Sequence, residues 1–116
     1  MPTCKITVLK RMFNPDLAEA YRRPDVHQGP CPLFVEGQEF IVRHLGERPS
    51  DFCDWAWNDI HKILMSLMTN GDFSPWMKDG NMMIACCTDG VKLVVFKPER
   101  IDELRHLPGR AGERAA

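Results

Sequence analysis

The chain has 116 residues, a length typical of one domain, and 44% of them are hydrophobic against 27% charged, which excludes a disordered or collagen-like chain. Lys and Arg total 15 against 16 for Asp and Glu, so the net charge of −1 lacks the basic excess that nucleic-acid binding requires. We therefore expect one globular domain with no nucleic-acid partner.

The first half of the chain predicts two strands and a short helix. Residues 4–12 alternate with the two-residue period of a strand. Asn14 as a cap and Pro15 at the first helical position predict a helix of about two turns that ends at Pro24. Residues 38–44 predict the second strand, because β-branched and aromatic side chains dominate there.

The second half predicts a long helix followed by a hairpin. Over residues 51–69 the apolar side chains fall within an arc of about 160° at 100° per residue, and Asn70-Gly71 marks the helix end. Residues 82–88 and 91–97 predict two strands that are joined at Asp89-Gly90, a dipeptide typical of tight turns.

The register of this hairpin decides which cysteine faces which side of the sheet. A two-residue turn pairs Cys86 with Leu93 and Cys87 with Lys92, so that the two cysteines lie on opposite faces. A three-residue loop with a bulge is the alternative, and it would shift these partners.

Together these elements predict an α+β fold: a single domain with a mostly antiparallel four-stranded sheet that is covered by one long helix, plus a short N-terminal helix. We expect residues 1–104 to form this domain, with a last turn of helix at 101–104. Residues 105–116 have few groups to bury, and we expect a mobile tail.

Neither a membrane span nor a signal peptide is expected, because charged residues interrupt the first apolar stretch and no apolar run approaches about 20 residues. We therefore expect a cytoplasmic protein with no membrane partner. In that reducing compartment the five cysteines, an odd number, should be free thiols.

Three of these thiols are candidates for catalytic chemistry. Cys31 lies between two prolines in a stiff loop, and Cys53 is expected in the first turn of the long helix, where the macrodipole favours a thiolate. Cys87 is expected to face Lys92 across the hairpin, which favours a thiolate in the same way. Each is a candidate nucleophile or acid/base group.

The alternative for every cysteine is plain packing, since a free cysteine often behaves as a small buried hydrophobe. Cys4 and Cys86 fit that interpretation best, because both are expected on apolar strand faces.

Aromatic side chains around one end of the long helix are candidates for ligand binding. Trp55, Trp57 and Trp76 can line an apolar pocket, with His61 at its edge and Lys92 as its basic group. Core packing is the alternative for Trp57, and a partly exposed boundary position is the alternative for His61. Trp55 lies off the apolar arc, so the loop around Trp76, a second chain or a ligand should cover it.

Zinc or another soft metal is the alternative cofactor hypothesis, with Cys31, Cys53 and Cys87 as the ligands. These cysteines lack the short ligand spacing of common zinc sites, so only the tertiary structure can assemble such a site.

Four separated motifs resemble an uncharacterised family of prokaryotic proteins of roughly a hundred residues. The motifs are Gly29-Pro30-Cys31-Pro32, Glu36-Gly37-Gln38-Glu39-Phe40, Phe52-Cys53-Asp54-Trp55-Ala56-Trp57, and Cys86-Cys87-Thr88-Asp89-Gly90 with Val95-Phe96-Lys97. The resemblance spans about residues 4–102 and implies that recurring thiols fall on Cys31, Cys53 and Cys87, and a recurring basic residue on Lys92. It implies no particular activity.

The sequence therefore supports three hypotheses. The first is a cysteine-lined site for a small molecule, with thiol-assisted catalysis. The second is a soft-metal-binding protein, and the third is a structural or partner-binding module whose cysteines are inert. Free sheet edges and an exposed Trp55 favour a homodimer.

Overall fold

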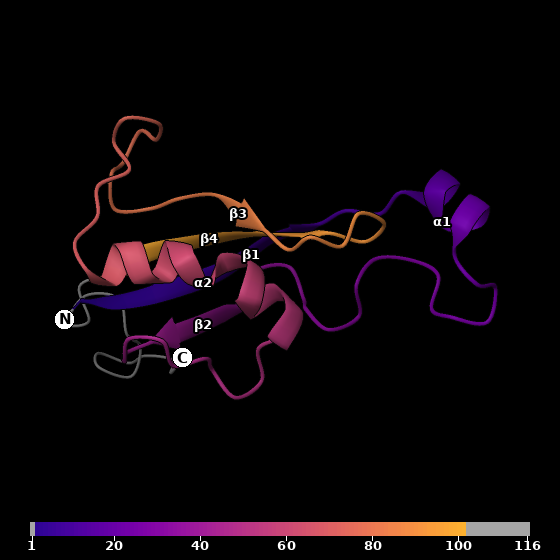
Figure 1. The fold of residues 1–116 in the computed structure, drawn as a ribbon, viewed down its shortest axis with the longest axis horizontal. Coiled ribbons are helices and arrows are strands. Elements are labelled where there is room, and N and C mark those ends of the chain that lie inside the picture. The colour runs from indigo at the N-terminus through magenta and orange to yellow at the C-terminus, as the bar shows by residue number, and fades with distance from the viewer. Residues whose placement is uncertain (1, 102–116) are drawn as a thin grey trace.

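The computed structural model describes residues 2–101 and has the predicted α+β architecture. The strands are β1 (Thr3–Arg11), β2 (Glu39–Val42), β3 (Ala85–Cys86) and β4 (Val94–Ile101), and the helices are α1 (Pro15–Tyr21) and α2 (Asp54–Met68). The strands form one antiparallel sheet in the order β2-β1-β4-β3, and α2 lies across one face of it (Figure 1). The predicted tail of residues 105–116 lies outside the described residues.

β1 is one of the two central strands, and its apolar face forms the floor of the core. Cys4, Ile6 and Val8 have exposed fractions of 0%, 0% and 1%, so the predicted alternation is confirmed. The strand pairs with both β2 and β4, and its register against β4 shifts between Val8 and Lys10. Two antiparallel partners satisfy both backbone edges of β1.

β4 is displaced along the chain from the predicted strand at 91–97, because it begins at Val94 and runs through Pro98 to Ile101. The carbonyl oxygen of Pro98 accepts a hydrogen bond from the Met83 amide at 3.1 Å, so the proline nitrogen faces the side of β3 and removes no bond to β1. The expectation of a helical turn starting at Ile101 is wrong, since this residue pairs with Thr3 in the sheet. Residues 102–104 lie outside the described part.

Both predicted hairpin registers are wrong. Cys86 lies opposite Val95 rather than Leu93, and six residues, 88–93, separate the facing pair of Cys87 and Val94. A tight turn of the predicted type requires positive φ angles, which neither residue of Asp89-Gly90 adopts. Relative to the two-residue turn the shift is two residues, an even number, so Cys86 and Cys87 keep their predicted faces of the sheet.

The core combines the apolar face of α2 with a cluster of phenylalanines from four segments. Helix residues in contact with the sheet are Ala56, Ile60, Leu64, Leu67 and Met68. The ring of Phe34, from the loop before β2, lies within 5.1–6.0 Å of the rings of Phe40, Phe52 and Phe96. This burial anchors an otherwise irregular loop to the sheet.

α2 begins later than predicted and ends where predicted. Its first residue is Asp54, because residues 49–52 form a turn in which the Phe52 amide donates to the Pro49 carbonyl at 3.1 Å. At the other end Asn70 adopts a φ of 65°, and the Gly71 amide donates to the Ser66 carbonyl at 2.7 Å. This left-handed residue terminates the helix.

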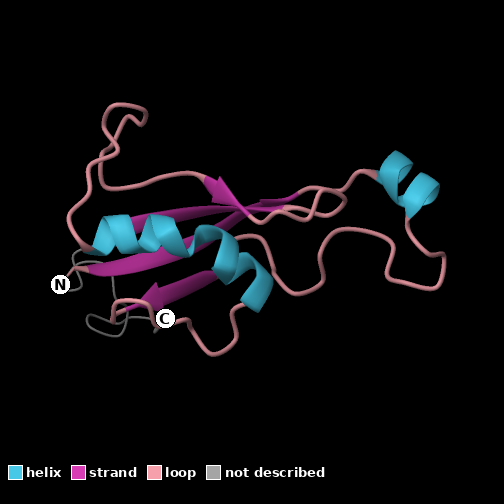
Figure 2. Cartoon of the chain, in the orientation of Figure 1, coloured by secondary structure: helices cyan, strands magenta, loops and turns pink. Residues whose placement is uncertain are grey.

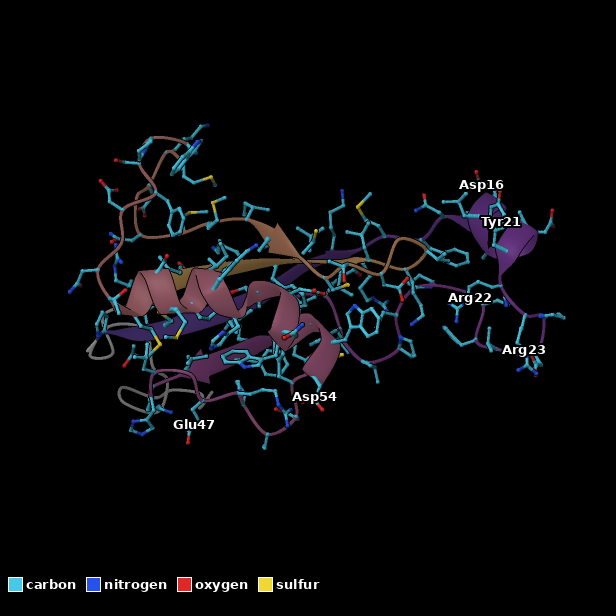
Figure 3. All side chains as sticks on the ribbon, in the orientation of Figure 1. Asp16, Tyr21, Arg22, Arg23, Glu47 and Asp54 are labelled. Atoms are coloured by element: carbon cyan, nitrogen blue, oxygen red, sulfur yellow. The ribbon has the colours of Figure 1, made fainter. Side chains whose placement is uncertain are left out.

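α1 projects from the body of the molecule, where irregular segments hold it away from the sheet (Figure 2). The helix ends at Tyr21, short of Pro24, and Ala18 is its buried residue. In Figure 3 the side chains of Asp16 and Tyr21 lie on this arm, remote from α2. The projection is reflected in a radius of gyration of 15.5 Å, against about 13 Å for a compact chain of 100 residues.

Within residues 2–101, neither helix is long and apolar enough to cross a lipid bilayer.

Candidate functional site

A cavity of about 180 Å³ lies at the N-terminal end of α2, where three distant segments meet. The segments are the loop before β2, the start of α2, and the β3–β4 connection with the start of β4. The lining residues are Cys31, Leu33, Phe34, Cys53, Trp55, Ala56, Cys87, Asp89, Lys92 and Val94. The structure thus brings all three candidate cysteines to one cavity, together with Trp55 and Lys92.

Cys31 is buried, with an exposed fraction of 6%, and the backbone around it is fixed from two sides. The Arg11 guanidinium donates to the Cys31 carbonyl oxygen at 2.9 Å, and Phe34, three residues later, is held in the aromatic core. A loop without regular structure therefore presents this thiol at a defined place.

Cys53 is the N-cap of α2 and not a residue of its first turn, as the later helix start requires. Its side chain makes no capping hydrogen bond and is half-buried, the most exposed of the three cavity thiols. Asp54 follows at the start of the helix (Figure 3) and pairs with Arg48 at 2.9 Å. Cys53 thus stands at the N-terminal end of a 15-residue helix whose first turn is acidic, with Asp54.

Cys87 follows β3 and is buried, with an exposed fraction of 9%. The Val94 amide donates a hydrogen bond to Cys87 Sγ at 3.3 Å, so β4 holds this sulfur atom in place. Lys92 is not its cross-strand partner, contrary to the predicted register, although both residues line the cavity.

The other two cysteines lie outside the cavity in opposite environments. Cys4 is fully buried in the core, and this burial raises the pKa of its thiol to about 11, despite the opposing effect of the Arg100 charge. Cys86 is exposed, so the expectation that it packs against an apolar face is wrong. The reason is that the described residues place α2 on the opposite face of the sheet, over Cys87.

Asp89 and Lys92 form the charged part of the cavity. Asp89 Oδ1 accepts the amides of Val91 and Lys92, both at 3.0 Å, and Asp89 Oδ2 lies 3.5 Å from Lys92 Nζ. Burial opposes ionisation of Asp89, but these two amides and the Lys92 ammonium outweigh it and lower the pKa of the carboxyl. Asp89 therefore fixes the wide loop as an anion that accepts two backbone amides. It does not adopt the left-handed conformation of a tight-turn residue.

Trp55 links α2 to the loop after β3. Its indole Nε1 donates to Thr88 Oγ1 at 2.9 Å, and the Thr88 amide donates to Asp59 Oδ2 at 2.7 Å. Trp55 and Asp59 are four residues apart and therefore share a face of α2. The indole remains 65% exposed, so the loop around Trp76 does not cover it.

The remaining predicted ligand-binding residues do not line this cavity. Trp57 packs edge-on against Phe52 with ring centres 6.0 Å apart, and the His61 ring lies tilted beside Trp57 with ring centres 5.4 Å apart. Trp76 is 71% exposed and lies 6.3 Å from the Phe73 ring, in the loop after α2. The tryptophans therefore belong to separate environments and not to one aromatic cluster.

In the part of the chain that the structure describes, no group of three or more His, Cys, Asp or Glu side chains is arranged so that it could hold a metal ion. Cys31, Cys53 and Cys87 line one cavity, but they do not form a ligand set. The geometry gives the soft-metal hypothesis no support.

Sequence reasoning missed several of the residues that form this site. Leu33, Phe34, Ala56 and Val94 are apolar wall residues, and Asp89 was interpreted only as a turn residue. The four-residue spacing of Trp55 and Asp59 was a signal for a shared helix face, but nothing local indicated that Thr88 would bond to both.

Searches against protein-family models, curated proteins and solved structures found no significant match to this chain. The resemblance to the family of short prokaryotic proteins stays a prediction. The site must therefore be interpreted from its own geometry.

Proposed function

We propose that the cavity binds a small molecule and that Cys53 is the nucleophile that reacts with it. The observation that carries this proposal is the convergence of Cys31, Cys53 and Cys87 from three segments on one cavity of about 180 Å³. A cysteine that packs only as a hydrophobe needs no cavity beside it, whereas a thiol that reacts with a ligand does.

Cys53 is favoured over the other two cavity thiols by access. It is half-buried at the end of α2, whereas Cys31 and Cys87 are 6% and 9% exposed, and the Cys87 sulfur is already held by the Val94 amide. Cys31 and Cys87 would then shape the soft, polarisable wall beside the reacting sulfur.

The size of the cavity limits the ligand. Pockets that bind drug-sized ligands have volumes of about 300–1,000 Å³, whereas this cavity has about 180 Å³. The ligand is therefore a small metabolite-sized compound, with an apolar part that packs against Leu33, Phe34 and Val94. The chemistry requires reduced thiols, as in the cytoplasm, where we propose that the protein acts.

Alkylation of the folded protein tests the proposal. With limiting iodoacetamide near neutral pH, we expect Cys53 to be modified much faster than Cys4, which is buried and has a raised pKa. Peptide mapping by mass spectrometry gives the rate at each cysteine. Cys86, exposed on the other face of the sheet, is the internal reference for an accessible thiol outside the cavity.

A Cys53→Ser variant should lose this reaction while Cys86 keeps its rate. If Cys53, Cys31 and Cys87 were all as inert as Cys4 until the protein unfolds, the cysteines would only pack, and the proposed function would be wrong.

A further inference from the structure

We infer that the small molecule bound in this cavity carries a carboxylate, and that Lys92 recognises it. This inference rests on the proposed function, since it concerns the ligand class of the same site. Among the described residues that line the cavity, Lys92 carries the only positive side-chain charge.

The Lys92 ammonium is held in place by an ion pair that does not use all of its hydrogen-bond donors. Its side chain is 19% exposed, and its ion pair in the described part of the chain is the 3.5 Å contact with Asp89 Oδ2. An ammonium has three N–H donors. The group therefore has donors left for a ligand atom in the cavity.

Asp89 does not completely cancel the positive charge of Lys92, because its carboxylate also interacts with backbone amides of the loop. Asp89 Oδ1 already accepts two backbone amides, from Val91 and Lys92, at 3.0 Å each. The negative charge of Asp89 is thus partly balanced by the loop backbone, and an anion near Lys92 Nζ still experiences a net attraction.

The rest of the cavity explains why one anionic group, and not a polyanion, is expected. Leu33, Phe34, Trp55, Ala56 and Val94 form apolar walls, and the described lining residues include one cation, Lys92, which leaves a second negative charge on the ligand without a partner. A short apolar compound with one carboxylate fits both the apolar walls and the single cation of the cavity. Its reactive carbon would lie toward Cys53 and its carboxylate toward Lys92.

Two alkylating reagents that differ only in charge test this inference. Iodoacetate and iodoacetamide react by the same mechanism. The thiol first loses its proton to the buffer, and the thiolate sulfur then forms a bond to the methylene carbon as the carbon–iodine bond breaks and iodide leaves. We expect the ratio of the iodoacetate rate to the iodoacetamide rate to be about tenfold higher at Cys53 than at Cys86, as an attraction of about 1.4 kcal/mol would give.

Three variants assign the effect to Lys92. Lys92→Met should reduce the ratio at Cys53 to that at Cys86, whereas Lys92→Arg should preserve most of it. Lys78→Met makes the same change in net charge in the exposed loop after α2 and should leave the ratio unchanged.

The outcomes separate this inference from the proposed function. If both reagents modify Cys53 with the same ratio as Cys86, or if Lys92→Met keeps the raised ratio, the inferred carboxylate recognition is wrong while the reactive thiol stands. If neither reagent modifies Cys53 in the folded protein, the proposed function itself fails. The iodoacetamide rate in Lys92→Met shows whether the cavity has kept its shape.

Discussion

Five cysteines with identical chemistry occupy four different environments in this protein. Cys4 is enclosed by the core, Cys86 faces solvent, Cys53 caps a helix beside a cavity, and Cys31 and Cys87 form part of the wall of that cavity. The reactivity of a thiol depends on its thiolate fraction and on its access. Access distinguishes Cys53 from the two buried cysteines of the cavity wall, and the functional proposal depends on that difference.

The burial of the Cys4 thiol predicts that the folded protein loses stability at alkaline pH. Burial raises its pKa from 9.0 to about 11 in the folded protein, so between these values the unfolded chain loses a proton that the folded chain keeps. This contribution to the free energy of unfolding is complete below pH 9 and is lost as the pH rises toward 11, by about 3 kcal/mol at about 1.4 kcal/mol per pKa unit.

Urea unfolding between pH 8 and 11 measures this effect. We expect the free energy of unfolding to fall more steeply in the wild-type protein than in Cys4→Ala, whose lower stability should show a flatter dependence on pH. Equal slopes in the two proteins would show that Cys4 does not titrate as its burial requires.

At the scale of the elements, one polar link holds the cavity together. The loop after β3 is attached to α2 through Thr88, which donates to the carboxylate of Asp59 and accepts from the indole of Trp55. Since Trp55, Asp89 and Lys92 line the cavity, this link sets the distance between the helix wall and the loop wall.

Substitution of Thr88 tests this link. Thr88→Val removes the hydroxyl while preserving side-chain shape, and we expect a loss of about 1 kcal/mol in unfolding free energy. Thr88→Ser retains the hydroxyl and should stay within about 0.5 kcal/mol of the wild type. Urea unfolding measures both, and a Val variant as stable as the Ser variant would show that the loop is held without these bonds.

At the scale of the whole molecule, the sheet and α2 form a packed body from which the α1 arm projects (Figure 2). α1 has seven residues and buries Ala18, while Leu17 and Tyr21 are 40% and 83% exposed. Isolated helices shorter than about 12 residues are marginal in water. The arm is thus the part of the described chain with the least support from tertiary packing.

Hydrogen exchange distinguishes the arm from the body. We expect the helical amides of Ala18 and Arg22, which bond to Asn14 and Ala18 at 3.0 and 2.9 Å, to exchange at least a hundredfold faster than those of β1. The measurement is amide exchange followed by mass spectrometry or NMR. Equal protection of the arm and β1 would mean that another surface covers α1, as the predicted homodimer would provide.

The features of this structure that can be predicted from the sequence are those that depend on interactions between residues close together in the chain. The alternation that buries Cys4, Ile6 and Val8 and the periodicity that buries Ile60 and Leu64 are local patterns, and both were interpreted correctly. The start of α2 and the hairpin register were not, because the turn at Pro49 and the two amides bound by Asp89 compete with the usual local signals.

The amino-acid sequence alone determined the α+β class, the faces of its strands and helix, and the free thiols as the chemistry to examine, because each follows from side-chain periodicity and residue type. Only the tertiary structure decided that Cys31, Cys53 and Cys87 share one cavity with Lys92, while Trp57, His61 and Trp76 lie elsewhere. The physical reason is that the cavity is built from contacts between segments 20 or more residues apart, such as Arg11 with Cys31 and Trp55 with Thr88. Such contacts leave no periodic trace in the sequence.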